Sequence, residues 1–204
     1  MLKKIILAAL VVASAVFAQV DVSGRIAFSY GTVWGENSEE IDWGAGFLVG
    51  PEVKYSFNPM ISLISGLELD YRRMSYDYHV DYNRDIDPDL RNYDVTETTS
   101  FMYLDVPVLL RVNPVSFFFV EAGFILGLNL SSNNVMEYEG ESISDDVSKS
   151  TKAFEFDLAC GLGFTVFSEL DLGFRAVFGM TSMSKKSDNV KNLRLQAGLT
   201  YWAF

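Results

Sequence analysis

The feature that most constrains this chain is a period-two alternation of apolar and polar residues that runs through a predicted hairpin, Thr99 to Leu130. One face of its first arm carries Met102, Leu104, Val106, Val108, Leu110 and Val112, and one face of its second arm carries Val120, Ala122, Phe124, Leu126, Leu128 and Leu130. Successive side chains of a β-strand point to opposite faces, so each arm is expected to be a strand with one apolar face. Because about ten residues suffice for a tilted strand to cross a bilayer, the hairpin predicts two neighbouring strands of a transmembrane barrel.

The same alternation recurs in six further segments, which gives eight expected strands. Beside the two arms of the hairpin, they span residues 20–32, 43–57, 60–80, 153–167, 170–181 and 192–204. Asn58-Pro59, Asn113-Pro114 and Ser168-Glu169 are expected to be tight turns, whereas residues 81–94 and 131–152 are expected to be long polar loops. The sequence therefore predicts an all-β fold, an eight-stranded antiparallel up-and-down transmembrane β-barrel with short periplasmic turns and long extracellular loops.

The N-terminal residues have the pattern of a secretory signal peptide. Lys3 and Lys4 precede a short apolar core, and small or aliphatic residues follow up to Ala18. We expect residues 1–18 to be this signal and residues 19–204 to form one outer-membrane β-barrel domain. The only cysteine, Cys160, cannot form an internal disulfide and is expected to be a small apolar side chain on the lipid face.

Charged residues decide which face of the strands points outward, since a lipocalin-type barrel also has eight antiparallel strands. The following charged residues of the expected strands all lie on the face opposite the apolar one: Arg25, Glu52, Lys54, Glu68, Asp70, Arg72, Asp105, Arg111, Glu121, Glu155, Asp157, Arg175 and Arg194. Many Phe and Leu side chains would overfill a small lumen, so the apolar face is expected to meet lipid. The charged face then forms a lumen network whose basic and acidic groups can pair, because isolated buried charges would be costly.

Aromatic residues near the strand ends are expected to form interfacial girdles. Those expected on the short-turn side are Tyr55, Phe57, Phe117, Phe167, Tyr201 and Trp202, and those on the long-loop side are Tyr30, Trp43, Tyr71, Phe101, Tyr103, Phe154 and Phe178. Pro51 and Pro107 cannot donate to a ladder in a barrel that has no free edge. Each of them therefore predicts a bulge or a local break in strand pairing.

The segment Tyr103-Leu-Asp-Val-Pro-Val-Leu-Leu-Arg111 resembles a strand of the small outer-membrane β-barrel family that includes PorT-like proteins. The resemblance implies an eight-stranded outer-membrane barrel and brings no catalytic residues. Some members of that family are accessory components of a protein secretion system. The terminal Phe204 resembles an outer-membrane insertion signal, although Trp202 and Thr200 depart from its usual apolar phase, so the last strand either contains a bulge or carries a weak signal.

No catalytic, cofactor or metal site is predicted. Asp77, His79 and Asp81 would share a face of an extended third strand, but a lone histidine in a polar hairpin is more often incidental. Asp85, Asp87 and Asp89 have the spacing of a calcium loop, yet Leu90 replaces its glycine and Thr96 its glutamate. The paired inner carboxylates Glu68/Asp70 and Glu155/Asp157 are expected to be structural, because side chains fill the lumen of an eight-stranded barrel.

The sequence thus predicts a non-enzymatic outer-membrane protein with a structural or surface-interaction role through its loops. The alternatives are an accessory subunit of a secretion system, a barrel enzyme acting on lipid or peptide, and a narrow channel. Expected partners are outer-membrane lipids, the barrel assembly machinery through the C-terminal strand, and a protein or surface ligand at the loops of a monomer. The net charge of −11 argues against nucleic acid.

Overall fold

A computed structural model of the chain describes residues 20–35, 41–80, 93–138, 141–185 and 190–203. The expected signal peptide, Asp81, the candidate calcium loop and Phe204 lie outside these residues, as does the side chain of His79. In the described part of the chain no helix is long and apolar enough to span a membrane.

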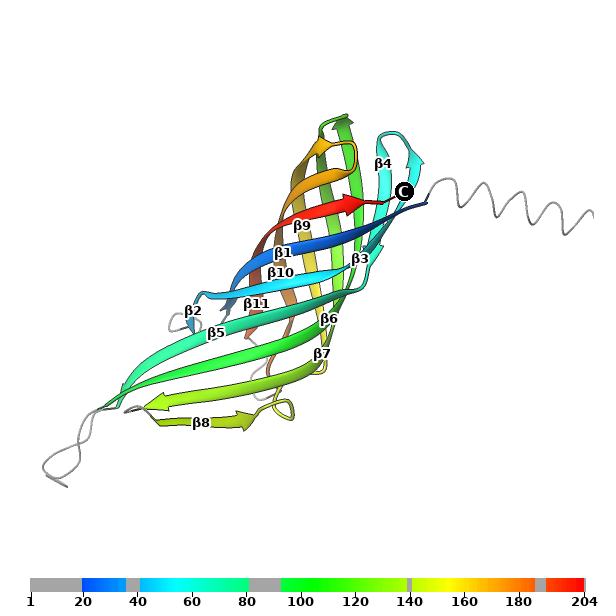
Figure 1. Cartoon of the computed structure of the whole chain (residues 1–204). Coiled ribbons are helices and arrows are strands. Elements are labelled where there is room, and N and C mark those ends of the chain that lie inside the picture. Colours follow the sequence, from blue (N-terminus) through cyan, green and yellow to red (C-terminus); the bar gives the residue numbers. More distant parts are fainter. Residues whose placement is uncertain (1–19, 36–40, 81–92, 139–140, 186–189, 204) are drawn as a thin grey trace, which may run out of the picture.

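The strands form one closed antiparallel ring (Figure 1). They are β1 (Val20–Trp34), β2 (Ile41–Asp42), β3 (Gly44–Asn58), β4 (Ile61–Gly66), β5 (Glu68–Val80), β6 (Tyr93–Val115), β7 (Phe118–Tyr138), β8 (Glu141–Asp146), β9 (Phe154–Phe167), β10 (Leu170–Ser182) and β11 (Lys191–Trp202). β4 and β5 together make one wall strand, and β11 pairs with β1 to close the ring. The barrel therefore has eight wall strands, as predicted, while β2 and β8 are short additions to β5 and β7.

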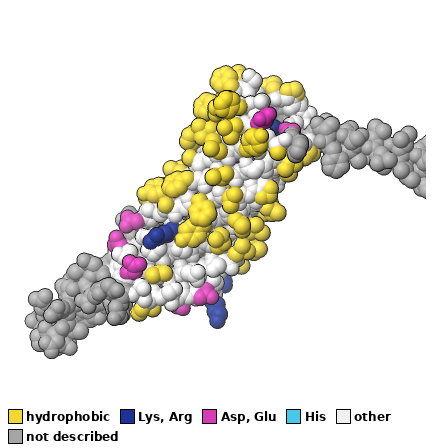
Figure 2. All heavy atoms as spheres, viewed as in Figure 1, with side chains coloured by type: hydrophobic (Ala, Val, Ile, Leu, Met, Phe, Trp, Pro, Cys, Tyr) yellow, Lys and Arg dark blue, Asp and Glu magenta, His cyan; other side chains and the backbone are white. Residues whose placement is uncertain are grey.

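The apolar face of the strands points outward, as predicted. Ile26, Phe47, Leu69, Phe174 and Leu199 are all exposed on the barrel wall. Figure 2 shows apolar side chains over most of the visible wall, while charged side chains gather toward the two ends. Cys160 also lies exposed on this outer wall.

Three short turns define one end of the barrel. The first is fixed by Asn58, whose Oδ1 accepts hydrogen bonds from the backbone N–H groups of Met60 and Ile61, both at 2.9 Å. The third lies at residues 168–169, as predicted. The expected turn at Asn113-Pro114 is wrong, because β6 continues to Val115 and the turn falls at residues 116–117. A register shift between Val112 and Val115 absorbs the proline within the strand.

The two prolines face the same interruption of the wall. β4 ends at Gly66 and β5 begins at Glu68, so Leu67 lies in a break between them. Pro51 of β3 stands opposite Leu67 and accepts a 3.0 Å hydrogen bond from its N–H, whereas β6 pairs with β4 only up to Val108 and with β5 only from Asp105. Proline has no N–H to donate to the ladder, so the pairing of this wall strand is interrupted both toward β3 and toward β6. The register is the same before and after the break.

The long connections are more ordered than expected. Residues 131–152 were expected to be a polar loop, but β7 continues to Tyr138 and β8 folds back against it. A register shift between Met102 and Tyr103 of β6 corresponds to one extra residue on β7 near Leu130. This bulge reverses the inward and outward phase of β7, so Ser132 and Asn134 become buried where the preceding pattern would turn them outward.

Candidate functional site

The lumen of the barrel is filled by ion pairs. Of the thirteen predicted lumen residues, twelve are buried in it; the exception is Lys54, which is partly exposed at the short-turn end and binds Asp21 at 2.7 Å. The sequence reasoning omitted Asp171, whose carboxylate is buried on the inward face of β10. The buried network therefore contains eight carboxylates and five guanidinium groups, and it divides into two layers.

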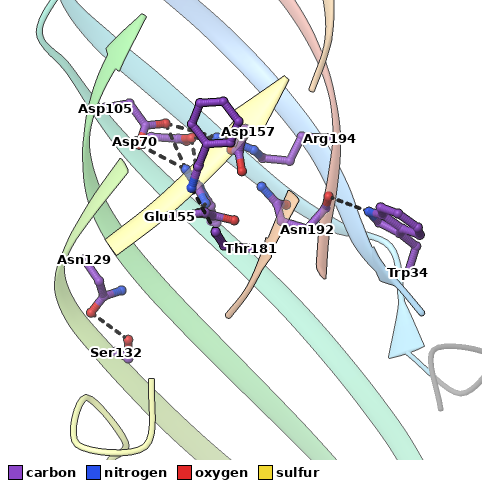
Figure 3. Close-up of polar contacts among 12 residues, drawn as sticks. Trp34, Asp70, Asp105, Asn129, Ser132, Glu155, Asp157, Thr181, Asn192 and Arg194 are labelled. Atoms are coloured by element: carbon purple, nitrogen blue, oxygen red, sulfur yellow. Dashed lines mark hydrogen bonds and ion pairs between the residues drawn. The ribbon is translucent and has the colours of Figure 1, made fainter. Parts of the chain in front are cut away.

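The first layer surrounds Arg72 and Arg194. The guanidinium of Arg72 donates to Asp70 at 2.9 Å, to Asp105 at 2.8 Å and to Glu155 at 2.5 Å. Arg194 binds Asp157 at 2.8 Å and also binds Asp70 and Asp105. Figure 3 shows Asp70, Asp105, Glu155 and Asp157 close together in the lumen beside Arg194. Gly127 gives this layer room, since a Cβ there would lie 2.9 Å from Asp105 Oδ1.

The second layer lies toward the short-turn end and surrounds Arg111 and Arg175. Arg175 binds Glu121 at 2.9 Å and has longer contacts with Glu52 and Glu68. Arg111 binds Asp171 at 2.6 Å and Glu121 at 3.3 Å. Arg25 completes the layer, with its Nε 3.4 Å from Glu68.

Aromatic rings stack on the cations inside the lumen. The guanidinium of Arg72 lies 3.9 Å from the centre of the Tyr103 ring, and that of Arg111 lies 3.8 Å from the Phe119 ring. Trp202 is buried at the short-turn end, where its Nε1–H donates to Asp171 Oδ2 at 2.8 Å. The girdle predictions for Tyr103 and Trp202 are therefore wrong, because both rings occupy the inward phase of their strands and fill the lumen.

The remaining predicted girdle residues are either packed in the interior or exposed on the wall. Phe101 packs on a buried apolar cluster at the long-connection end, so its girdle assignment is also wrong. The other predicted girdle residues are exposed or partly exposed: Tyr30, Trp43, Tyr55, Phe57, Tyr71, Phe117, Phe154, Phe167, Phe178 and Tyr201. Tyr30 stacks on Trp43 with ring centres 5.3 Å apart. The last strand contains no bulge along its pairing with β1, so the inward phase of Trp202 is regular.

A cavity of about 490 Å³ opens at the long-connection end. Its apolar walls come from Val33 of β1, Met74 of β5, Phe101 of β6, and Met183 and Val190 beside β10 and β11. Tyr103 packs against the same apolar cluster and stacks on Arg72, so it joins the floor of the cavity to the first ion-pair layer.

The segment between β8 and β9 forms one side of this cavity. Val147 N–H donates to Ser132 O at 3.0 Å, and Lys152 N–H donates to Met183 O at 2.8 Å. Ser148 N–H donates to Asp146 Oδ1 at 2.9 Å, and hydrogen bonds from the side chain and backbone of Ser148 lower the pKa of that exposed carboxyl. These bonds attach the segment to both β7 and the end of β10, so the cavity has a defined wall.

The polar part of the cavity is formed by Asn134, Glu97 and several hydroxyl groups. Asn134 faces inward because of the β7 bulge, where Ser132 Oγ also donates to Asn129 Oδ1 at 3.1 Å (Figure 3). Asn134 Nδ2 donates to Glu97 Oε1. The sequence reasoning missed this site, because Asn134 lies beyond the point where the alternation changes phase. The only signal for it was a second, shifted alternation after Leu130.

None of the alternative sites of the sequence reasoning is assembled in the described residues. Asp77 is exposed on β5. Within the described ranges, no group of three His, Cys, Asp or Glu residues is arranged to hold a metal ion. The inner carboxylate pairs Glu68/Asp70 and Glu155/Asp157 take part in the ion-pair layers described above.

Comparison with protein families shows to which family the chain belongs. Residues 17–185 match the model of the outer membrane protein beta-barrel domain. The chain belongs to this family. Membership makes it an outer-membrane β-barrel, and the narrower likeness to PorT-like proteins stays a prediction. A search of curated proteins gave no match.

Solved structures share the fold of this family member. The attachment invasion locus protein Ail of Yersinia pestis is 14% identical, with a TM-score of 0.52 over 90% of this chain and 99% of Ail. The same protein in complex with the heparin analogue sucrose octasulfate is 15% identical, with a TM-score of 0.50 and the same coverage. At this level of identity the similarity concerns the barrel fold alone.

Proposed function

We propose that this outer-membrane barrel is a non-enzymatic protein that binds a ligand at its long-connection end, and that this end faces the cell exterior. The observation that carries the proposal is the contrast between the two parts of the interior. The lumen is filled by two ion-pair layers and by stacked aromatic rings, whereas the long-connection end holds an open cavity of about 490 Å³. Cavities of this size are typical of small-molecule sites.

The orientation follows from the lengths of the connections. Outer-membrane barrels have short periplasmic turns and long extracellular loops. The cavity lies among the long connections, and Trp202 lies at the opposite end with the short turns. A ligand from outside the cell would therefore reach the cavity without crossing the lumen.

The chemistry of the cavity favours binding over catalysis. Its described lining offers hydroxyl groups, the amide of Asn134 and the carboxylate of Glu97, with no histidine or cysteine among them that could activate a hydroxyl. The Ail complex contains a sulfated ligand, but in the described lining of this cavity the only ionisable carboxyl is that of Glu97 and no Lys or Arg is present. This composition supports a ligand that is not a polyanion.

Site-specific labelling of intact cells tests the orientation. Lys149→Cys lies beside the cavity and Ser168→Cys lies in a short turn, and both positions are exposed. In a Cys160→Ala background, a maleimide coupled to a large polymer should label Lys149→Cys on intact cells and Ser168→Cys only after the outer membrane is permeabilised. The reverse pattern would place the cavity on the periplasmic side and would overturn the proposal.

Planar bilayers test binding against transport. Because side chains fill the lumen, the purified protein is expected to show no steady conductance at the level of a water-filled pore. Sustained conductance of that size would support the channel alternative instead.

A further inference from the structure

The lining of the cavity at the long-connection end has an apolar part and a polar part. Met74, Met183 and Phe101 form a continuous apolar wall, and the first two are buried. Methionine side chains are unbranched and polarizable, so they adapt to the shape of an apolar group. This wall suits the hydrocarbon or aromatic part of a small ligand.

The polar part of the lining contains the pair Asn134 and Glu97, whose orientation is fixed. Asn134 lies directly across from Thr99 in the β6–β7 ladder, and its Nδ2 donates to Glu97 Oε1. This bond determines which amide atom is the oxygen, because a carboxylate can accept but cannot donate. Asn134 is 7% exposed, and its Oδ1 is buried with no hydrogen-bond partner among the described residues.

A ligand in the cavity does not reach this fully buried oxygen, but the Glu97 side chain is partly exposed and its carboxylate accepts hydrogen bonds from N–H or O–H donors. The neighbouring Glu97 carboxylate favours a donor that also carries positive charge, because charge-assisted hydrogen bonds are the stronger kind. No Lys or Arg side chain of the described lining supplies that charge. Within the described lining, the corner formed by Asn134 and Glu97 therefore has no cation of the kind that its chemistry favours.

We propose that this cavity binds a small amphipathic amine, with its ammonium group at the Glu97 carboxylate and its apolar part against Met74, Phe101 and Met183. The inference rests on the proposed binding function and adds the chemical class of the ligand. It predicts discrimination by head-group charge, since a carboxylate in the same position would face the carboxylate of Glu97. A cavity that selected ligands by their volume alone would not distinguish an amine from a carboxylic acid of the same size.

The test uses the full mature chain in phosphatidylcholine nanodiscs with isotope-labelled methionine methyl groups. The probes are 4-phenylbutylamine, the neutral 4-phenylbutanol and the anionic 4-phenylbutyrate, which share one apolar body. Saturable shifts of the Met74 and Met183 methyl signals are expected with the amine, and the affinity for the acid should be at least about ten times weaker. No saturable shift is expected at Met60, which is exposed in the first short turn at the other end of the barrel. Equal affinity for amine and acid would overturn the amine assignment while leaving a binding cavity in place.

Two variants locate the selectivity. Glu97→Gln keeps the shape of the side chain and should reduce amine affinity about tenfold with little effect on the alcohol. The matched control is Glu137→Gln, which removes an exposed carboxylate of β7 outside the cavity and should leave amine affinity unchanged. If both variants lower amine affinity equally, general surface charge explains the selectivity and the assigned corner is wrong.

Asn134→Ala provides a second measurement if Glu97→Gln does not fold, as judged by heat-modifiable electrophoretic mobility. It removes the N–H donor that positions the Glu97 carboxylate and should also weaken the amine more than the alcohol. Failure of the cell-labelling experiment would reject the exterior-facing function, whereas failure of the charge discrimination would reject only the ligand class.

Discussion

Replacing Arg72 tests whether the ion-pair layers stabilise the barrel. In the native lumen this guanidinium contacts Asp70, Asp105 and Glu155 at 2.5 to 2.9 Å and covers the Tyr103 ring. Among the described residues, Arg72→Ala would leave Glu155 with no salt bridge, and Asp70 and Asp105 with Arg194 alone. Removing one partner of a buried salt bridge typically costs about 3–5 kcal/mol, so we expect a loss of that size in the free energy of unfolding.

The loss can be measured by urea titration of the protein in lipid vesicles, with tryptophan fluorescence and heat-modifiable mobility as two independent signals. Arg73→Ala is the matched control, because Arg73 is the next residue of β5 and its side chain is exposed. Its effect should stay within about 0.5 kcal/mol. A loss below about 1 kcal/mol for Arg72→Ala, or equal losses for the two variants, would refute the reasoning.

A double variant separates charge from packing at the same place. Asp105→Asn removes the charge of a carboxylate that loses its 2.8 Å salt bridge in Arg72→Ala and keeps only the longer contact with Arg194. The two changes should therefore be non-additive, with the double variant more stable than the sum of the single losses predicts by about 0.5–3 kcal/mol. Strict additivity would mean that Arg72 stabilises the lumen through its volume and its contact with Tyr103 rather than through its charge.

Two further substitutions test the packing of the lumen by the same urea titration. Trp202→Phe should cost about 1–3 kcal/mol, because it removes the hydrogen bond to Asp171 and leaves a buried carboxylate oxygen with one donor fewer; no measurable change would show that the indole fills space only. Gly163→Ala should also destabilise by about 1–3 kcal/mol, since its Cβ would lie 2.5 Å from Leu172 O, whereas Gly24→Ala meets no atom within 4 Å and should be neutral. Equal effects of the two alanines would contradict the described packing.

The sequence predicted most of the wall because each wall strand has only two faces and one of them is apolar. Where Ile26 and Leu199 alternate with inward residues, the pattern alone was sufficient. The prediction failed for two aromatic residues whose rings face inward. Tyr103 and Trp202 were assigned to girdles by residue type and position near a strand end, although the parity of their positions placed them with Asp105 and Thr200.

The cavity could not be predicted for a different physical reason. A single extra residue near Leu130 reverses which side chains of β7 face inward. A prediction that follows one alternating pattern along the sequence therefore ends the strand at this point and assigns the following residues to a loop. The backbone ladder continues regardless, because its hydrogen bonds do not depend on which side chain faces inward. The partnership of Asn134 with Glu97 also requires the register between β6 and β7, which pairs Thr99 with Asn134 and cannot be obtained from either segment alone.

The seam between β1 and β11 bears on how the barrel assembles. It pairs Ser23 with Trp202, so the ring closes only when residues at nearly opposite ends of the chain meet. Each ion-pair layer joins strands on the two sides of this seam, since Arg194 of β11 binds Asp70 of β5 and Arg175 of β10 contacts Glu52 of β3. An unclosed sheet would thus have two unpaired edges and also carboxylates separated from their arginines. Closure would therefore satisfy the backbone edges and the interior charges in the same step, which predicts a highly cooperative final stage of folding.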